Sequence, residues 1–217
     1  TDIKVAADGE LLLKGDNIMK GYYNNPEATN KDIVDGWFHT GDVGRVDEDG
    51  FVYITGRKKE IYVSSAGKNI APLVIEETMK SISLVSQCFL VGDRRKFCSA
   101  LFTLDVGVIL RDKVKVELDK IPKDPLQQIK MLEQNSFNLS DFTDNEEIYN
   151  EIENSVQKLN KEFSNPEQIK KFKILSRDFT IDDGELTPTL KIRRKQINDN
   201  WSSVIEAMYT ADSEHDG

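Results

Sequence analysis

The sequence has few cysteines, no long apolar run and no signal-peptide pattern. Its two cysteines, Cys88 and Cys98, form neither a metal-binding spacing nor a disulfide framework, and we expect both to be core or sheet-face residues rather than nucleophiles. No stretch approaches the roughly 18 apolar residues that a transmembrane helix needs, and nothing at the start resembles a signal peptide. We therefore expect a reducing, cytoplasmic setting, in which any contact with a membrane would have to be peripheral.

Basic residues are also in the minority. Lys and Arg number 29 against 38 Asp and Glu, so the 217-residue chain carries a formal net charge of −9. This balance argues against nucleic-acid binding through a broad basic surface. Hydrophobic residues at 38% and charged residues at 31% are an ordinary mixture for a globular chain, and the length allows one large or two small domains.

Residues 35–60 combine a turn, a strand and two charged side chains that suit a nucleotide. Asp42 follows Gly41 in a turn, Asp49-Gly50 is a hairpin signal, and the alternation after it predicts a short strand that ends at Arg57. A carboxylate suits the two hydroxyls of a ribose, and an arginine suits ribose or phosphate oxygens. Taken alone, however, an Asp in a turn and an Arg after a strand are most often structural.

Four sequence motifs follow one another along the chain, and two of them overlap residues 35–60. They read G-Y-Y-N-N-P-E-A-T from Gly21, W-F-H-T-G-D from Trp37, G-R-K-K-E-I from Gly56 and L-T-P-T-L-K-I-R-R from Leu186. Together they resemble the adenylate-forming superfamily of acyl-CoA synthetases, luciferases and peptide-synthetase adenylation domains. The last motif has Leu190 where the common family pattern has glycine. Its sequence is most similar to that of the long-chain fatty acid–CoA ligases.

The resemblance implies roles in adenylation for three residues. Lys191 would be the catalytic lysine, whose ammonium orients the carboxylate and the α-phosphate and offsets the negative charge of the transition state. Asp42 would accept hydrogen bonds from the ribose hydroxyls, and Arg57 would donate to ribose or phosphate oxygens. Without the motif, Lys191 would be explained as part of a solvated basic face, in a run that also holds Arg193, Arg194 and Lys195. We expect Arg193 and Arg194 to touch solvent or the CoA phosphates.

The resemblance also implies a lid that rotates between two half-reactions. Lys59 would be its hinge, because a hinge absorbs a large backbone change over very few residues. The small-residue loop of Ser65, Ala66 and Gly67 would face the pantetheine of CoA. A plain turn before a helix explains that loop equally well.

The implied reaction joins ATP, a fatty acid and CoA into acyl-CoA, AMP and pyrophosphate through an acyl adenylate. The implied cofactors are ATP/AMP and CoA. The family's phosphate loop, its fatty-acid pocket and its Mg²⁺ ligands are expected upstream, since nothing in residues 1–20 supplies them, and we assign no metal site here. We therefore expect the C-terminal part of a longer enzyme, inactive as an isolated fragment.

Two alternatives stay open at this point. One is a fatty acyl–AMP ligase that passes its product to a carrier-protein phosphopantetheine instead of free CoA. The other is a non-catalytic nucleotide-binding or regulatory module that keeps the same fold. The presence of Asp42, Arg57 and Lys191 together argues against an inactive copy, because drift would have removed one of them.

The expected fold class is α+β. Residues 1–57 would be the end of a small distorted β-barrel of a large AMP-binding domain, and residues 58–217 a small mixed α+β lid. Within the lid we expect a helical insert at about 106–163 and a polar tail at 210–217. We also expect a helix capped by Asn25 with Pro26 at its first position, and a second helix start capped by Asn165. A capping box of Thr143 with Glu146 and one final helix complete the expected elements.

Overall fold

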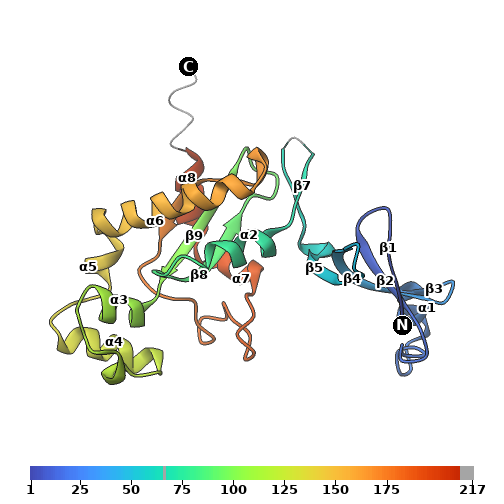
Figure 1. Cartoon of the computed structure of the whole chain (residues 1–217), viewed down its shortest axis with the longest axis horizontal. Helices are drawn as coiled ribbons and strands as arrows, with labels where there is room; N and C mark the ends of the chain where they lie inside the picture. Colours follow the sequence, from blue (N-terminus) through green and yellow to red (C-terminus); the bar gives the residue numbers. More distant parts are fainter. Residues whose placement is uncertain (66, 211–217) are drawn as a thin grey trace, which may run out of the picture. The chain divides into compact units, whose positions relative to one another are not determined.

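The computed structural model describes residues 1–65 and 67–210. It is an α+β fold, as the sequence predicts, and it divides into two compact units (Figure 1). Unit 1 contains Thr1–Val63 and Asn69–Val74, and unit 2 contains Ser64–Lys68 and the chain from Ile75 onward. Ala66 and all of the predicted tail except Thr210 lie outside the described residues.

Unit 1 is built on one five-stranded antiparallel sheet. The strand order is β1-β2-β4-β3, with β5 paired to β4, so the described strands form an open sheet rather than a closed barrel. Unit 1 also holds helix α1, whose N-cap Asn25 accepts from the Ala28 N–H with Pro26 at the first position, as predicted. The strands and helix are β1 (Asp2–Val5), β2 (Glu10–Lys14), α1 (Pro26–Asp32), β3 (Ile33–Val34), β4 (Trp37–Val46) and β5 (Val52–Arg57).

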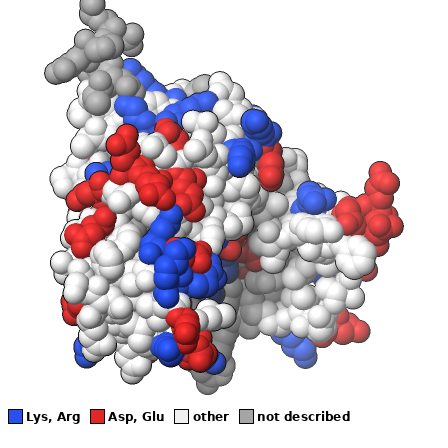
Figure 2. Space-filling model, turned by 60° about the vertical axis from the view of Figure 1, so that its left-hand side comes forward, with Lys and Arg blue, Asp and Glu red and all other residues white. Residues whose placement is uncertain are grey.

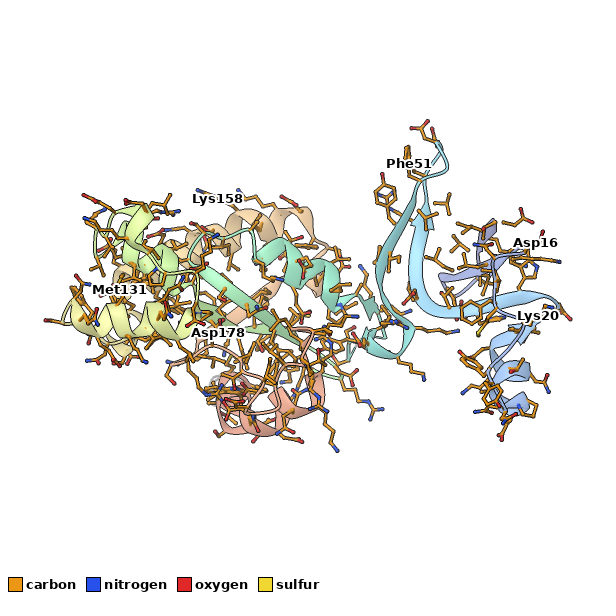
Figure 3. All side chains as sticks on the ribbon, turned by 90° about the horizontal axis from the view of Figure 1, so that it is seen from below. Asp16, Lys20, Phe51, Met131, Lys158 and Asp178 are labelled. Carbon is orange, nitrogen blue, oxygen red and sulfur yellow. The ribbon has the colours of Figure 1, made fainter. Side chains whose placement is uncertain are left out.

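The β4–β5 hairpin is closed by the predicted Asp-Gly turn. Asp47 Oδ1 accepts from the backbone N–H groups of Asp49 and Phe51, and Gly50 has φ +84°, which glycine adopts without strain. Phe51 lies at the hairpin tip and points away from the sheet (Figure 3). The hairpin delivers Arg57 to the position opposite Asp42.

Short elements connect this sheet to unit 2. A 3₁₀ turn follows β5 directly, then a two-stranded ribbon and a helix. They are η1 (Lys58–Glu60), β6 (Tyr62–Val63), β7 (Asn69–Ile70) and α2 (Pro72–Met79).

Unit 2 has a three-stranded sheet at its centre, in the order β10-β9-β8. The middle strand β9 (Cys98–Leu104) runs antiparallel to β8 (Val85–Val91) and parallel to β10 (Ile169–Ile174), and all of its residues are buried. Residues of β8 and β9 pack against the C-terminal helices α7 (Arg194–Asn200) and α8 (Ser202–Thr210). This cluster contains Phe89, Val91, Leu101, Leu175, Phe179, Leu186, Ile197, Ile205 and Met208.

Both cysteines are buried in these strands, which confirms their predicted structural role. Burial raises the pKa of Cys98 to about 11, with a further contribution from Glu167, and raises the pKa of Cys88 as well. A thiol held in its neutral form is a poor nucleophile.

The predicted helical insert is a series of short helices between β9 and β10. Three of them, α3, α4 and α5, group at one end of unit 2 (Figure 1). No described helix is long and apolar enough to cross a membrane. The elements are α3 (Val106–Asp112), η2 (Leu118–Lys120), α4 (Pro125–Gln134), α5 (Ser140–Thr143), α6 (Glu146–Leu159) and η3 (Asn160–Glu162).

Three local predictions in unit 2 are wrong. Asn145, not Thr143, caps α6, because Thr143 is buried at the end of α5 while Asn145 Oδ1 accepts from the first helical N–H groups. The expected helix after Asn165 is only the turn η4 (Asn165–Glu167), in which Ser164 and Glu167 form the capping box. The single final helix is divided at Trp201 into α7 and α8.

Candidate adenylation site

The two predicted nucleotide-binding residues face one another across adjacent strands of unit 1. Asp42 on β4 is the cross-strand partner of Arg57 at the end of β5, and Arg57 Nε lies 2.9 Å from Asp42 Oδ1. The Asp42 side chain is 24% exposed and that of Arg57 is 61% exposed. An ion pair this open to solvent contributes little to stability, so the pair is suited to exchanging its contact for a ligand's hydroxyl or phosphate oxygens.

Glu10 organises the part of β4 that leads into Asp42. The sequence predicts a turn here, but Gly41 and Asp42 lie within the continuous strand β4, whose pairing with β2 is irregular between Glu10 and Leu12. Its carboxylate accepts from His39 Nδ1 at 3.0 Å, from the Gly41 backbone N–H at 2.9 Å and from Lys58 Nζ at 3.0 Å, and the residue is buried. Glu10 is not among the site residues predicted from the sequence. The available signal was a charged residue that opens an apolar strand directly after the Asp8-Gly9 turn.

Burial would raise the pKa of Glu10, but the hydrogen bonds from His39, Lys58 and Gly41 outweigh burial and hold the pKa below its usual value of 4.5. The folded state therefore favours the carboxylate, and its contribution to stability is present above about pH 4.5 and lost as the pH falls. We expect Glu10→Gln to remove this pH-dependent contribution to stability. Hydrogen exchange of β2 and of residues 39–42 of β4, compared at pH 4 and pH 7, measures it.

The control for this prediction is Asp8→Asn, because Asp8 binds the same Lys58 from a half-exposed position. Wild type should exchange faster at pH 4 than at pH 7 after correction for intrinsic rates, and Glu10→Gln should show little such difference. An unchanged pH dependence in Glu10→Gln, or an equal loss in Asp8→Asn, would contradict the role of Glu10.

Lys191 lies in unit 2, on a tight loop before α7. Thr187 binds the Lys191 backbone twice: its N–H donates to the Lys191 carbonyl at 2.8 Å, and its Oγ1 accepts from the Lys191 N–H at 3.0 Å. Leu186 and Ile192 form an antiparallel bridge at the base of the loop. The Lys191 side chain is exposed and has no hydrogen-bond or ion-pair partner among residues 1–65 and 67–210. The loop therefore fixes the lysine's backbone and leaves its ammonium free.

The conformation of Leu190 explains why the common family pattern has glycine there. Its φ is +59°, in the left-handed region that residues with a Cβ adopt at a cost of about 1 kcal/mol. Its side chain is 67% exposed, so burial of its own side chain does not offset that cost. Leu190 therefore differs from glycine in its side chain but has the left-handed backbone conformation that favours glycine.

Glu185 holds the first half of the same loop. Its fully buried carboxylate accepts from Arg177 at 2.6 and 3.0 Å and from Trp201 Nε1 at 2.8 Å. Burial would raise the pKa of Glu185, but hydrogen bonds from Arg177, Asn200 and Trp201 outweigh it and lower the pKa. The Glu185 carbonyl also accepts from the Arg193 N–H at 2.8 Å, which closes the loop from its far side.

Comparison with known proteins places these features in a family. The profile of the AMP-binding enzyme C-terminal domain matches residues 126–213. A long-chain-fatty-acid–CoA ligase of Mycobacterium tuberculosis, FadD15, is 41% identical over 207 residues, which is 95% of this chain and 32% of the relative. The human long-chain-fatty-acid–CoA ligase ACSBG1 is 35% identical over 93% of this chain and 28% of the relative. The chain is thus similar over nearly its whole length to one part of these ligases.

Solved structures of adenylate-forming enzymes share the fold. The A-PCP didomain of a carboxylic acid reductase from Segniliparus rugosus, in complex with AMP, matches 95% of this chain and 25% of its own at a TM-score of 0.67 and 24% identity. An o-succinylbenzoate CoA synthetase from Bacillus subtilis, with ATP and magnesium ion, matches 91% of this chain and 34% of its own at a TM-score of 0.56 and 22% identity. The chain spans about a third of the length of the curated relatives it matches.

The residues predicted for the superfamily's lid motion lie on two short segments. Lys59 is exposed in the 3₁₀ turn η1 of unit 1. Ser65 and Gly67 belong to unit 2, where the Ser65 N–H donates to the Arg95 carbonyl at 3.3 Å. Gly67 has φ +76°, and a Cβ added there would meet nothing within 4 Å, so the backbone is open to a close approach. The third residue of this loop, Ala66, is not among those described.

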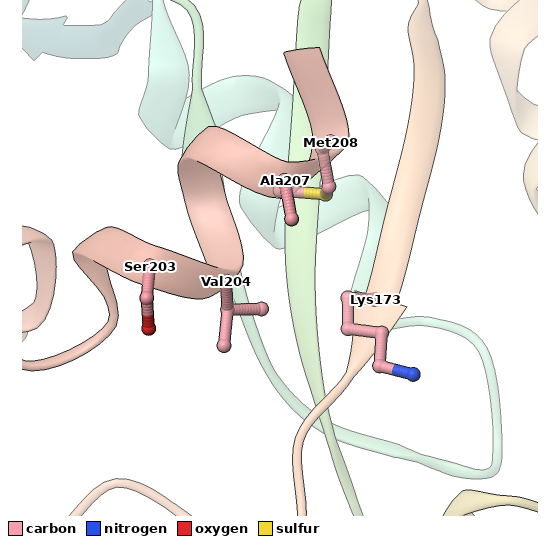
Figure 4. Close-up of a pocket in the computed structure, with 5 residues that line it drawn as sticks. All are labelled: Lys173, Ser203, Val204, Ala207 and Met208. Atoms are coloured by element: carbon pink, nitrogen blue, oxygen red, sulfur yellow. The ribbon is translucent and has the colours of Figure 1, made fainter. Parts of the chain in front are cut away.

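A pocket of about 440 Å³ lies elsewhere in unit 2. It is lined by Lys173 of β10 and by four residues of α8, Ser203, Val204, Ala207 and Met208 (Figure 4). None of the predicted adenylation residues lines it.

Basic and acidic side chains alternate in small groups over the face of the molecule in Figure 2. Among residues 1–65 and 67–210, no group of three or more His, Cys, Asp and Glu side chains is arranged to hold a metal ion, so the described residues do not fit the Mg²⁺ that the superfamily implies.

Proposed function

We propose that this chain is the C-terminal part of an AMP-forming long-chain fatty acid–CoA ligase. The observation that carries the proposal is the 41% identity to a ligase of that name over 95% of the chain. That span includes Asp42 and Lys191. The substrates are a fatty acid, ATP and CoA. The products are acyl-CoA, AMP and pyrophosphate.

In the first half-reaction, a carboxylate oxygen of the fatty acid attacks the α-phosphorus of ATP, and the bond to pyrophosphate breaks. Negative charge grows on the phosphoryl oxygens and on the leaving group. The Lys191 ammonium lies between the reacting carboxylate and the α-phosphate and offsets that charge. Asp42 accepts from the ribose hydroxyls, and Arg57 donates to ribose or phosphate oxygens. The free ammonium on a fixed backbone supports this assignment.

In the second half-reaction, the CoA thiolate attacks the acyl carbonyl carbon and AMP leaves. Lys59 is the hinge about which the lid turns between the two steps, and the loop of Ser65, Ala66 and Gly67 faces the pantetheine. The open space beside Gly67 supports that role, because a residue without a side chain allows a thin pantetheine arm to approach the backbone closely.

Lys59→Pro tests the hinge. Proline fixes φ near −65°, which suits the 3₁₀ turn that Lys59 occupies and opposes rotation to any other conformation. In the complete protein we expect adenylation to continue while acyl-CoA formation falls by roughly 100-fold. Pyrophosphate release and thioester formation, assayed separately, measure the two steps.

Lys59→Ala serves as the matched variant, because it removes the ammonium without restricting φ. The rate of thioester formation by Lys59→Ala should be well above that of Lys59→Pro. Equal loss of both half-reactions in Lys59→Pro would contradict the hinge assignment.

The choice of acyl acceptor tests the ligase proposal against its relatives in the superfamily. The complete protein is given a fatty acid and ATP with either free CoA or a holo carrier protein, and the thioester is quantified by mass spectrometry. Acyl-CoA as the main product supports the proposal. Transfer to the carrier protein with no acyl-CoA would replace it with a fatty acyl–AMP ligase.

A further inference from the structure

A second buried carboxylate, Glu76 on α2, lies against the far end of the Lys191 loop. Glu76 Oε1 accepts from Arg194 Nη1 at 2.8 Å and Glu76 Oε2 accepts from Arg194 Nη2 at 2.6 Å. The Glu76 side chain is 4% exposed and that of Arg194 is 17% exposed. This is a paired, two-bond contact between residues far apart in sequence, and it is almost closed to water.

The pair ties α7 to the sheet as well as to α2. Glu76 Oε1 also accepts from the Leu90 N–H of the edge strand β8 at 2.8 Å, and the Arg194 guanidinium lies 5.5 Å from the centre of the Phe89 ring. Glu76 therefore accepts hydrogen bonds both from the edge strand β8 and from Arg194, the first residue of α7. The predicted contact of Arg194 with solvent or CoA phosphates is not what the structure has, since its guanidinium binds Glu76.

Arg194 is three residues after Lys191, and little freedom remains between them. The Arg193 N–H is held by the Glu185 carbonyl, and Ile192 is bridged to Leu186. A displacement of Arg194 would therefore be passed along the backbone to Lys191. Buried ion pairs are on average no more stabilising than apolar packing of the same volume, so stability alone does not explain why two charges are placed here.

We propose that Glu76 and Arg194 are positioning residues, which set the place of Lys191 for adenylation by fixing the start of α7 to α2 and β8. The proposal rests on the proposed function, since it needs Lys191 to act in the adenylation step. Neither side chain touches the substrates. The pair acts through the backbone of the loop.

The test compares Arg194→Lys with wild type in the complete protein. Lysine keeps the charge but loses the planar fork that engages both Glu76 oxygens. We expect fatty-acid-dependent pyrophosphate release to fall by about 10- to 100-fold, because a shift of about 1 Å in a catalytic group has that effect. Thioester formation from preformed acyl adenylate should stay close to wild type. Lys195→Gln, at the exposed neighbouring position, is the matched control and should retain both steps.

Two further readouts separate positioning from simple loss of folding. Hydrogen exchange in Arg194→Lys should rise in the peptide covering 186–194 and not in β9. Glu76→Gln combined with Arg194→Gln should lose no more adenylation than the worse single variant, because the two residues act as one unit.

Three results would overturn the proposal. Arg194→Lys could keep full pyrophosphate release, it could lose both half-reactions in equal proportion, or its exchange could rise throughout unit 2. The first would show that the pair is dispensable, and the others that it only stabilises the fold. A wild-type protein that releases no pyrophosphate with any fatty acid would instead remove the proposed function, and the role of the pair with it.

Discussion

Lys191→Ala in the complete protein is expected to lower fatty-acid-dependent pyrophosphate release by roughly 10²- to 10³-fold, the usual effect of removing one preorganised charge-stabilising group. The side chain is exposed and the backbone is held by Thr187, so the change removes the ammonium and leaves the loop in place. Thioester formation from preformed acyl adenylate should be unaffected. The two assays, run on the same preparation, give the ratio that tests the assignment.

Lys195→Ala is the matched control for this variant, because it removes an exposed lysine from the same basic run. It should keep both activities. If Lys191→Ala retains both half-reactions, the lysine assignment is wrong and the 186–194 motif is only a basic turn. If both half-reactions fall together, Lys191 is not specific to adenylation.

The second large effect is expected from Glu185→Gln, which should lower the free energy of unfolding. The substitution leaves Arg177 facing a neutral amide and places an NH₂ group among donors, so it replaces charge-assisted hydrogen bonds with a mismatch. We expect a loss of about 2–3 kcal/mol, below the 3–5 kcal/mol typical of a fully buried pair, because the Arg177 side chain is 38% exposed. Chemical unfolding followed by tryptophan fluorescence measures it, since Trp201 contacts Glu185 directly.

Asp183→Asn provides the comparison for Glu185→Gln. Asp183 lies 3.3 Å from the same guanidinium but is about half exposed, so its loss should lower stability by under about 1 kcal/mol. The Glu185 effect should also shrink as the pH falls below about 4.5, because the lowered pKa of Glu185 means that its contribution is lost when the carboxyl is protonated. Equal effects from the two substitutions, or no dependence on pH, would contradict this account.

Local features of the fold were predictable from the sequence. Asn25 and Pro26 mark the start of α1, and Asp49-Gly50 marks the β4–β5 hairpin, because caps and tight turns depend on residues that are adjacent in the chain. The motif resemblance also predicted the superfamily. The cap at Asn145 was missed because Thr143 competes with it in the sequence, and only the structure shows that Thr143 is buried. The cap at Ser164 was missed because the neighbouring Asn165 is an equally good capping residue.

The carboxylates that support the candidate site were not predictable in the same way. Glu10, Glu185 and Glu76 are indistinguishable in sequence from surface acids, and their partners lie on other elements. A buried carboxylate is stable only when such partners converge on it, and that convergence is a property of the tertiary structure. The exposed residues Asp42, Arg57 and Lys191 were named from motifs instead, and their roles stay predictions until they are tested.

The measurement that tests the central claim most directly is pyrophosphate release from ATP by the complete wild-type protein, with and without a long-chain fatty acid. The account predicts release that requires the fatty acid, acyl-CoA on addition of CoA, and no turnover by the isolated 217-residue chain. Release by the isolated chain would contradict the division of the active site between this chain and the rest of the enzyme. No release by the complete protein with any fatty acid would contradict the ligase itself.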